Sequence, residues 1–135
     1  MKFDPVNLDW VDSHKLFASA VVPRPIAFVS TIGEDGVYNV APFSFFTALT
    51  VKPALIGFCN TWTREGRKKD TLRNIEFTKE FVINIIDETL AEPMNQASYP
   101  YPSDVDEFKE AGLTPVKADL VKAPMVAESP VCGFR

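Results

Sequence analysis

The chain has 135 residues, of which 46% are hydrophobic and 24% are charged, and its formal net charge is −4. This composition is typical of one soluble globular domain and argues against a disordered chain or a broad nucleic-acid-binding surface. No run of about 18 apolar residues occurs, so we expect no membrane-spanning helix, and the N-terminus lacks the apolar core of a secretory signal. We therefore expect a single domain over residues 1–135, in the cytoplasm.

The sequence offers few residues for metal binding or for acid–base catalysis. Cys59 and Cys132 form no CxxC pair, and His14 is the only histidine. With so few ligands, neither a zinc site nor a disulfide framework is expected. No Ser–His–Asp or Cys–His arrangement is evident, so we predict no catalytic side chain. An enzyme built from these residues would take its reactivity from a cofactor.

The N-terminal region predicts one short helix. We expect Asp12 to cap a helix over residues 13–20, with Leu16 and Phe17 turned inward. The proline at position 23 ends this helix, because proline disfavours the helical conformation in the residue before it.

A run of antiparallel strands is predicted next. The sequence GEDG at residues 33–36 indicates a hairpin turn, and β-branched and aromatic residues are frequent on both sides of it. The strands that we expect cover residues 26–32, 37–41, 43–50 and 54–60.

The second half of the chain alternates short helices with short strands. Asp70 is a candidate N-cap for a helix over residues 71–80 that buries Leu72 and Ile75. Residues 81–86, FVINII, form the most convincing strand, because they are short, β-branched and almost continuously apolar.

Two further short helices and an irregular tail are expected after that strand. Pro93 limits the first helix, at residues 88–98, and Asp104 is expected to cap the second, which ends at Gly112. We interpret the acidic residues of this second helix as a solvated face: Asp104, Asp106, Glu107 and Glu110. The proline-rich tail predicts edge strands and turns.

This order of elements favours a mainly β fold, a small β-barrel or curled sheet with two or three short helices. A doubly wound parallel sheet would need regular alternation of strands and helices, which the sequence lacks.

One segment stands out by its charge. Residues 63–73, the basic segment, hold five basic and two acidic residues, so this segment carries +3 while the rest of the chain carries −7. A lone basic segment in an acidic chain suits a small anion better than a polyanion. The alternative interpretation is a solvated charged loop.

The basic segment leads into the predicted helix of residues 71–80. A helix N-terminus presents unpaired N–H groups and partial positive charge, so it attracts phosphate. Arg67, Lys68 and Lys69 precede this terminus, and the Thr71 hydroxyl lies in its first turn. Asp70 could compete for the same N–H groups, or it could orient Lys69 or Thr71.

Pro42 indicates a special position in the predicted sheet. Proline has no N–H to donate, so the strand must lie at an edge, a bend or a bulge there. Asn39 and Ser44 flank this position, where unpaired backbone amides could contact a ligand. In the alternative interpretation, Asn39 only ends a strand and Ser44 is a surface residue.

Three motifs in this order resemble the flavin reductase-like family, whose members are FMN-binding split β-barrel flavoproteins. The motifs are RPIAFVST, N-x-APFSFF and KDTLRN, followed by EFVINI, and the similarity runs from about Leu16 to Pro130. The resemblance implies a homodimer that binds FMN near its interface and transfers hydride from NADH or NADPH to FMN. It also implies a flavin-dependent monooxygenase as a candidate partner.

The resemblance also implies a set of FMN-contacting residues. Residues expected beside the isoalloxazine and ribityl groups are Ser30, Thr31, Asn39, Ala41, Phe43, Ser44 and Phe45. Residues expected at the phosphate are Arg67, Lys69, Asp70 and Thr71, with Arg24 as a further candidate. Trp62 is expected either to stack near the flavin or to pack in the core.

Most of these observations are also consistent with two alternative functions. One is a non-catalytic FMN-binding protein that carries electrons or stores flavin, and the other is an interaction domain without a cofactor. Family chains generally continue beyond the ESPV element, whereas this sequence stops at VCGFR. We therefore expect a C-terminally short member with an unpaired strand edge, which favours dimer pairing or aggregation.

Overall fold

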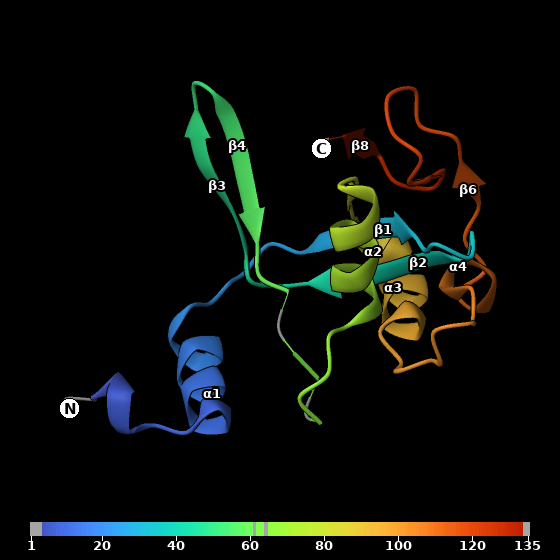
Figure 1. Ribbon diagram of the computed structural model, residues 1–135. Helices are drawn as coiled ribbons and strands as arrows, with labels where there is room; N and C mark the ends of the chain where they lie inside the picture. Colours follow the sequence, from blue (N-terminus) through green and yellow to red (C-terminus); the bar gives the residue numbers. More distant parts are fainter. Residues whose placement is uncertain (1–3, 61, 64, 134–135) are drawn as a thin grey trace.

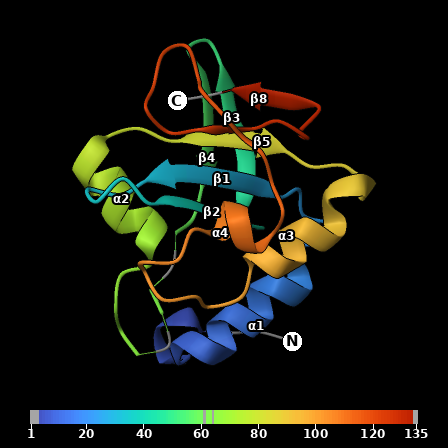
Figure 2. The same cartoon turned by 90° about the vertical axis from the view of Figure 1, so that its right-hand side faces the viewer.

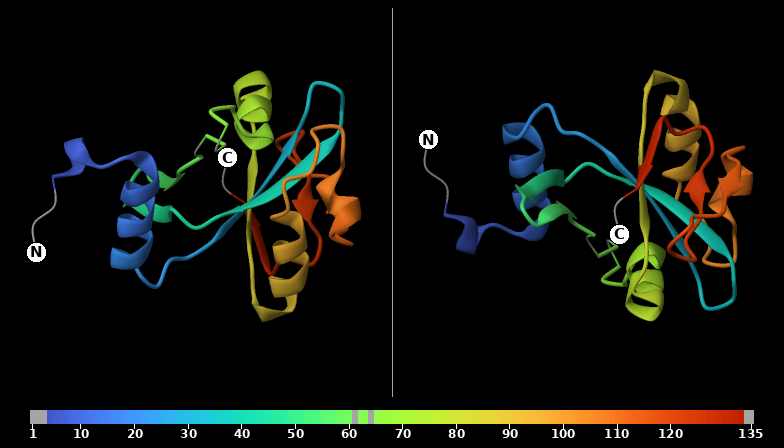
Figure 3. Two further views of the ribbon diagram at one scale, coloured as in Figure 1. Left: turned by 90° about the horizontal axis from the view of Figure 1, so that it is seen from below. Right: turned by 90° about the horizontal axis from the view of Figure 1, so that it is seen from above.

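The computed structural model describes residues 4–60, 62–63 and 65–133. Figure 1 shows the elements gathered around a central sheet, with helix α1 and the β3–β4 hairpin together on one side of it. The two views of Figure 3, from below and from above, also show α1 and the β3–β4 hairpin set apart from the other elements. The expectation of a mainly β chain with a few short helices is confirmed.

The central sheet is antiparallel and has the strand order β2-β1-β5-β8. Its strands are β1 (Ala27–Ile32), β2 (Tyr38–Phe43), β5 (Val82–Ile85) and β8 (Val131–Gly133). Strand β2 lies at an edge, and Pro42 pairs there with Phe28 of β1. The expectation of an edge position for Pro42 is therefore confirmed.

Two smaller sheets complete the β structure of the described residues. Their strands are β3 (Phe46–Val51), β4 (Ala54–Phe58), β6 (Pro115–Val116) and β7 (Met125–Val126). The predicted strand at 43–50 starts later than expected, because the chain bends at Ser44 and Phe45 on its way from the central sheet to the hairpin.

The helices are short, and all of them except α1 lie around the central sheet. They are α1 (Trp10–Ala20), α2 (Asp70–Thr78), α3 (Ala91–Ala97) and α4 (Glu107–Glu110), with 3₁₀ turns η1 (Pro5–Asn7) and η2 (Glu88–Leu90). Figure 2 shows α2 at one end of the central strands and α3 at the other, with α4 in front of them. Among the described residues, none of these helices has the length and apolar character needed to cross a membrane.

The predicted helix caps were wrong by one to three residues. Asp9, not Asp12, caps α1, and its carboxylate accepts a hydrogen bond from the Asp12 N–H at 2.8 Å. The N-cap of α2 is Lys69, so Asp70 is the first helical residue. Asp106, not Asp104, caps α4. Each of the aspartate-capped helices has two aspartates close to its start, so local sequence does not distinguish them.

The predicted apolar faces of α1 and α2 were also wrong. In α1, which is described throughout, no residue is buried, and Phe17 is 52% exposed because the helix stands away from the sheet. In α2 the buried residues are the polar Thr71 and Asn74, while Leu72 and Ile75 are only half-buried.

Successive side chains of a strand point to opposite faces of the sheet, so the hydrophobic core is divided between the two faces of the central sheet. One cluster includes Phe28 and Val40, which pack with Leu90 and Phe108 on the α3 and α4 side. The other cluster consists of Ala27, Val29, Phe43 and Ile83, against which Phe46 and Phe58 of the hairpin pack.

A buried polar network fastens the C-terminal tail to the central sheet. Asn84 Nδ2 donates to the Phe28 carbonyl and to Ser30 Oγ, each at 3.0 Å, and Asn84 Oδ1 accepts from the Val126 N–H at 2.9 Å. The Ser30 hydroxyl itself donates to the Pro124 carbonyl. Asn84 and Ser30 are fully buried, so these bonds replace the solvation that both side chains lose on folding.

Replacing Asn84 with alanine should destabilise the fold by about 2–3 kcal/mol, because buried partners in β1 and in the tail lose their hydrogen bonds. Urea unfolding followed by circular dichroism measures this change. Asn95→Ala is the matched control, since Asn95 is exposed on α3 and should change stability by less than about 0.5 kcal/mol. Equal effects of the two substitutions would contradict the role of the network.

Candidate functional site

A groove lies between the edge strand β2, the basic segment with the start of α2, and the loop that follows α3. Its volume is about 920 Å³, which is within the range of about 300–1,000 Å³ that is usual for small-molecule sites. The loop contributes residues 97–103, and Glu107 of α4 completes the lining.

The groove brings together predicted residues that are far apart in the sequence. From β2 they are Asn39, Ala41 and Phe43, and from the basic segment and α2 they are Arg67, Lys69, Asp70 and Thr71. The strand therefore forms one wall and the basic segment the other.

Lys69 occupies the junction between these two walls. It is half-buried, and burial lowers the pKa of its ammonium group. Its Nζ lies 5.5 Å from the centre of the Phe43 ring, a distance at which the ring attracts the cation. A bound anion would favour the charged form that burial disfavours.

The carboxylate of Asp70 does not cap the helix. It pairs with Arg73 Nη2 at 2.5 Å, one turn further along α2, and the N-cap residue makes no side-chain capping hydrogen bond. The Asp70 carboxylate therefore does not compete with a bound anion for the first N–H groups of α2. The positive end of this nine-residue helix lines the groove.

Asn39 is the centre of a buried polar network at the base of the groove. Its Oδ1 accepts hydrogen bonds from Thr71 Oγ1 at 2.9 Å and from Thr31 Oγ1 at 3.2 Å. Asn74 Nδ2 donates to Thr31 Oγ1 at 3.1 Å. Thr71 is only 2% exposed, so its hydroxyl holds α2 against the sheet.

Glu107 belongs to this site although it was not predicted there, as do Asn74 and residues 97–103. We expected a solvated helix face, but Glu107 is only 7% exposed, and its Oε1 accepts from Asn39 Nδ2 at 2.9 Å. Its Oε2 is buried and has no hydrogen-bond partner in the described part of the chain. Burial raises its pKa from the ordinary value of 4.5 to about 7, and the hydrogen bond from Asn39 opposes this rise.

The remaining basic residues next to the groove are more exposed. The backbone of Arg67 closes the loop, with Thr63 N donating to its carbonyl at 2.8 Å and its N–H donating to Thr63 Oγ1 at 3.1 Å. Lys68 pairs with Glu76 at 2.7 Å. Arg64 lies outside the described residues.

Three predicted residues form a separate cluster at the end of α1. Arg24 donates to the carbonyls of Ala18 and Val21 and, from Nε, to Ser44 Oγ at 3.3 Å. Its guanidinium carbon lies 5.6 Å from the centre of the Phe45 ring. These contacts attach α1 to the bend between β2 and β3, and the cluster does not line the groove.

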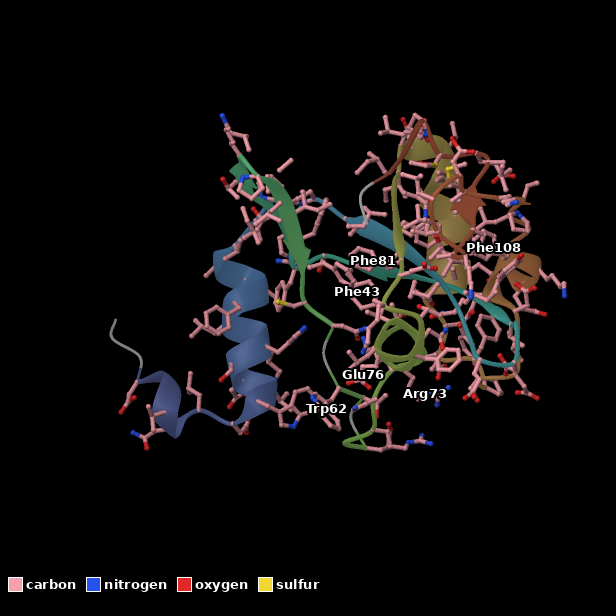
Figure 4. All side chains as sticks on the ribbon, turned by 45° about the horizontal axis from the view of Figure 1, so that its top comes forward. Phe43, Trp62, Arg73, Glu76, Phe81 and Phe108 are labelled. Atoms are coloured by element: carbon pink, nitrogen blue, oxygen red, sulfur yellow. The ribbon has the colours of Figure 1, made fainter. Side chains whose placement is uncertain are left out.

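Two more expectations concern side chains outside the groove. Ser30 and Thr31 are both fully buried, and the Ser30 hydroxyl belongs to the network that fastens the tail. The expectation of core packing for Trp62 was wrong, because its side chain is 57% exposed. Figure 4 shows Trp62 out on the loop before α2, away from Phe81.

Residues 18–132 match the family model of the flavin reductase like domain, so the chain belongs to that family. It is 43% identical to an uncharacterized protein of Halalkalibacterium halodurans over 96% of this chain and 62% of that protein.

Solved structures of related proteins confirm the expected fold. Nitrilotriacetate monooxygenase component B from Bacillus cereus is 32% identical and superposes with a TM-score of 0.90, over 98% of this chain and 65% of that one. A Shewanella frigidimarina protein with a split barrel domain is 26% identical, with a TM-score of 0.75, over 98% of this chain and 66% of that one. The fold is that of the split-barrel flavin reductases, and the chain spans about three fifths to two thirds of the length of these relatives.

The raised pKa of Glu107 makes the stability of the fold depend on pH. The folded state holds this proton up to about pH 7 and the unfolded state only up to about pH 4.5, so stability should fall as pH rises between these values. Above this window, Glu107→Gln should be more stable than the wild type by up to about 3 kcal/mol, because glutamine has no charge to bury.

Urea unfolding of both proteins at several pH values measures this difference. Glu110→Gln removes the same charge from an exposed position of α4 and is the matched control. Parallel pH profiles for the wild type and Glu107→Gln would contradict the prediction.

Proposed function

We propose that this chain provides the FMN site of an oxidoreductase that transfers hydride from NADH or NADPH to FMN. The observation that carries the proposal is the groove itself, in which an apolar edge strand faces a basic segment at a helix N-terminus. FMN combines a flat aromatic ring system with a phosphate, so it has one part for each wall.

The residues present fit this cofactor. Ala41, Pro42 and Phe43 give the strand wall an apolar surface, and β2 is an edge strand, so half of its backbone groups point away from β1. Lys69 and the first turn of α2 supply positive charge for the phosphate. Beside the groove, the buried Oε2 of Glu107 has no hydrogen-bond partner among the described residues.

Bound FMN would supply the electron chemistry by accepting hydride on its ring system. The task of the chain is then to bind and orient, which agrees with the absence of a predicted catalytic side chain. Lys69 would hold the phosphate, and the Asn39 network would hold the start of α2 at the correct distance from β2. Phe43, 5% exposed, closes the base of the groove with an apolar surface.

Two observations support the proposed partners of this enzyme. Similarity to a monooxygenase component B supports the proposal that reduced flavin passes to a monooxygenase partner. Apolar side chains on the hairpin, such as Leu49, Val51 and Leu55, are 63%, 91% and 49% exposed, which supports the proposal of a homodimer.

We also propose that residues 1–135 act as one domain, in the cytoplasm.

The purified protein tests the function directly. We expect it to bind FMN, measured by quenching of flavin fluorescence, and to oxidise NADH or NADPH only when FMN is present, measured by the absorbance of the reduced nicotinamide. Flavin binding without oxidation of either nicotinamide would favour the alternative of a non-catalytic protein that carries electrons or stores flavin. Failure to bind flavin would favour the interaction domain.

Replacing Lys69 with alanine should weaken FMN binding about 10- to 100-fold, because one charge-assisted contact to the phosphate is lost. Binding of riboflavin, which has no phosphate, should change much less. Lys117→Ala is the control, since Lys117 is exposed and does not line the groove. An equal loss for FMN and riboflavin would mean that Lys69 shapes the groove rather than binding phosphate.

Thr71 is a poor target for the same experiment. Its hydroxyl donates to Asn39 within the buried network, so Thr71→Ala would change folding and binding together. Lys69 is the better choice, because within the described residues its side chain makes no hydrogen bond or ion pair and contacts the Phe43 ring.

A further inference from the structure

We propose that Glu107 is a positioning residue whose protonation is coupled to ligand binding, so that its neutral form favours a phosphate-bearing ligand and its ionised form weakens binding. The inference rests on the proposed function, because it concerns the same groove. It adds a means of regulation to that site.

Glu107 lies where two hollows of the protein meet. One is the groove, and the other is a cleft of about 500 Å³ between the β1–β2 turn and α2, which includes Gly33, Asn74 and Phe77. Asn39 and Glu107 line both hollows. A carboxyl group at this junction can respond to a ligand in the groove and to solvent that enters through the cleft.

The two oxygens of Glu107 have different surroundings. Oε1 accepts from Asn39 Nδ2 in a bond that both the neutral and the ionised carboxyl group can make, although the ionised form accepts it more strongly. Oε2 is buried without a partner among the described residues. The position of Asn39 is therefore preserved in both protonation states, while the charge at Oε2 changes.

The charged groups around Glu107 do not neutralise it. Asp70 and Arg73 of α2 pair with each other, and Asp106 of its own helix pairs with Lys109. The β1–β2 turn adds two more carboxylates to the cleft, those of Glu34 and Asp35. Strand β2 contributes Tyr38, which contacts Phe108, and α3 carries the exposed Glu92. No ion pair joins Glu107 to a basic side chain in the described part of the chain.

Burial is the main reason why the pKa of Glu107 rises to about 7, and the charge of Asp70 adds to the rise. Lys69, on the other wall of the groove, marks the expected place of the phosphate. A phosphate in the groove would disfavour the ionised form of Glu107 further. By linkage, ionisation of Glu107 must weaken phosphate binding by the same factor.

The experiment compares FMN dissociation constants of the wild type, Glu107→Gln and the matched control Glu110→Gln, measured by flavin fluorescence. The ratio of the wild-type constant to that of Glu107→Gln should be close to one at about pH 6 and about five- to tenfold at about pH 8. The titration of the phosphate itself affects both proteins equally and cancels in this ratio. Riboflavin should give a ratio that changes little with pH.

A second measurement uses the wild type alone and does not depend on the folding of a variant. Carboxyl ¹³C NMR should show the titration midpoint of Glu107 moving to higher pH when FMN is added. A ratio that does not change with pH, or an unchanged midpoint, would overturn the inference while FMN binding leaves the proposed function standing. Absence of FMN binding to the wild type at every pH would overturn both.

Discussion

The side-chain amide of Asn39 determines where the basic segment lies. Its oxygen accepts from Thr31 and Thr71, and its nitrogen donates to Glu107, so one side chain connects β1, β2, α2 and α4. An amide can do this because it carries an acceptor with two lone pairs and two donor hydrogens. Without this connection, the N-terminus of α2 would have no fixed distance from the strand wall, and the groove would have no defined width.

The strands were largely predictable, whereas the ends of the helices were not. β1 and β5 are short, apolar and β-branched, and those are properties of the residues themselves. The choice between Asp9 and Asp12, or between Asp104 and Asp106, depends on the tertiary packing of each helix. The groove was predictable in outline, because Pro42 and the basic segment are visible in the sequence. The burial of Glu107 was not, since its partner Asn39 is 68 residues away.

Residues that carry a family resemblance need not all contact a ligand. Arg24 belongs to the first motif, yet its guanidinium is occupied by two carbonyls and Ser44, where it attaches α1 to the rest of the chain. Ser30 belongs to the same motif, and its hydroxyl is bonded within the core. A motif can therefore combine residues that build the fold with residues that line the groove, and the three-dimensional structure is needed to distinguish the two groups.

The hydrogen bonds of Ser30 and Asn84 with residues 124–126 affect how the protein folds while it is being synthesised on the ribosome. The groups that satisfy these two side chains come later in the sequence: the Pro124 carbonyl lies 94 residues after Ser30, and the Val126 N–H lies 42 residues after Asn84. Until this part of the chain has left the exit tunnel, β1 and β5 would have to bury polar atoms without partners. We therefore expect the nascent sheet to stay open, and available to chaperones, until residues 124–126 have emerged from the ribosome.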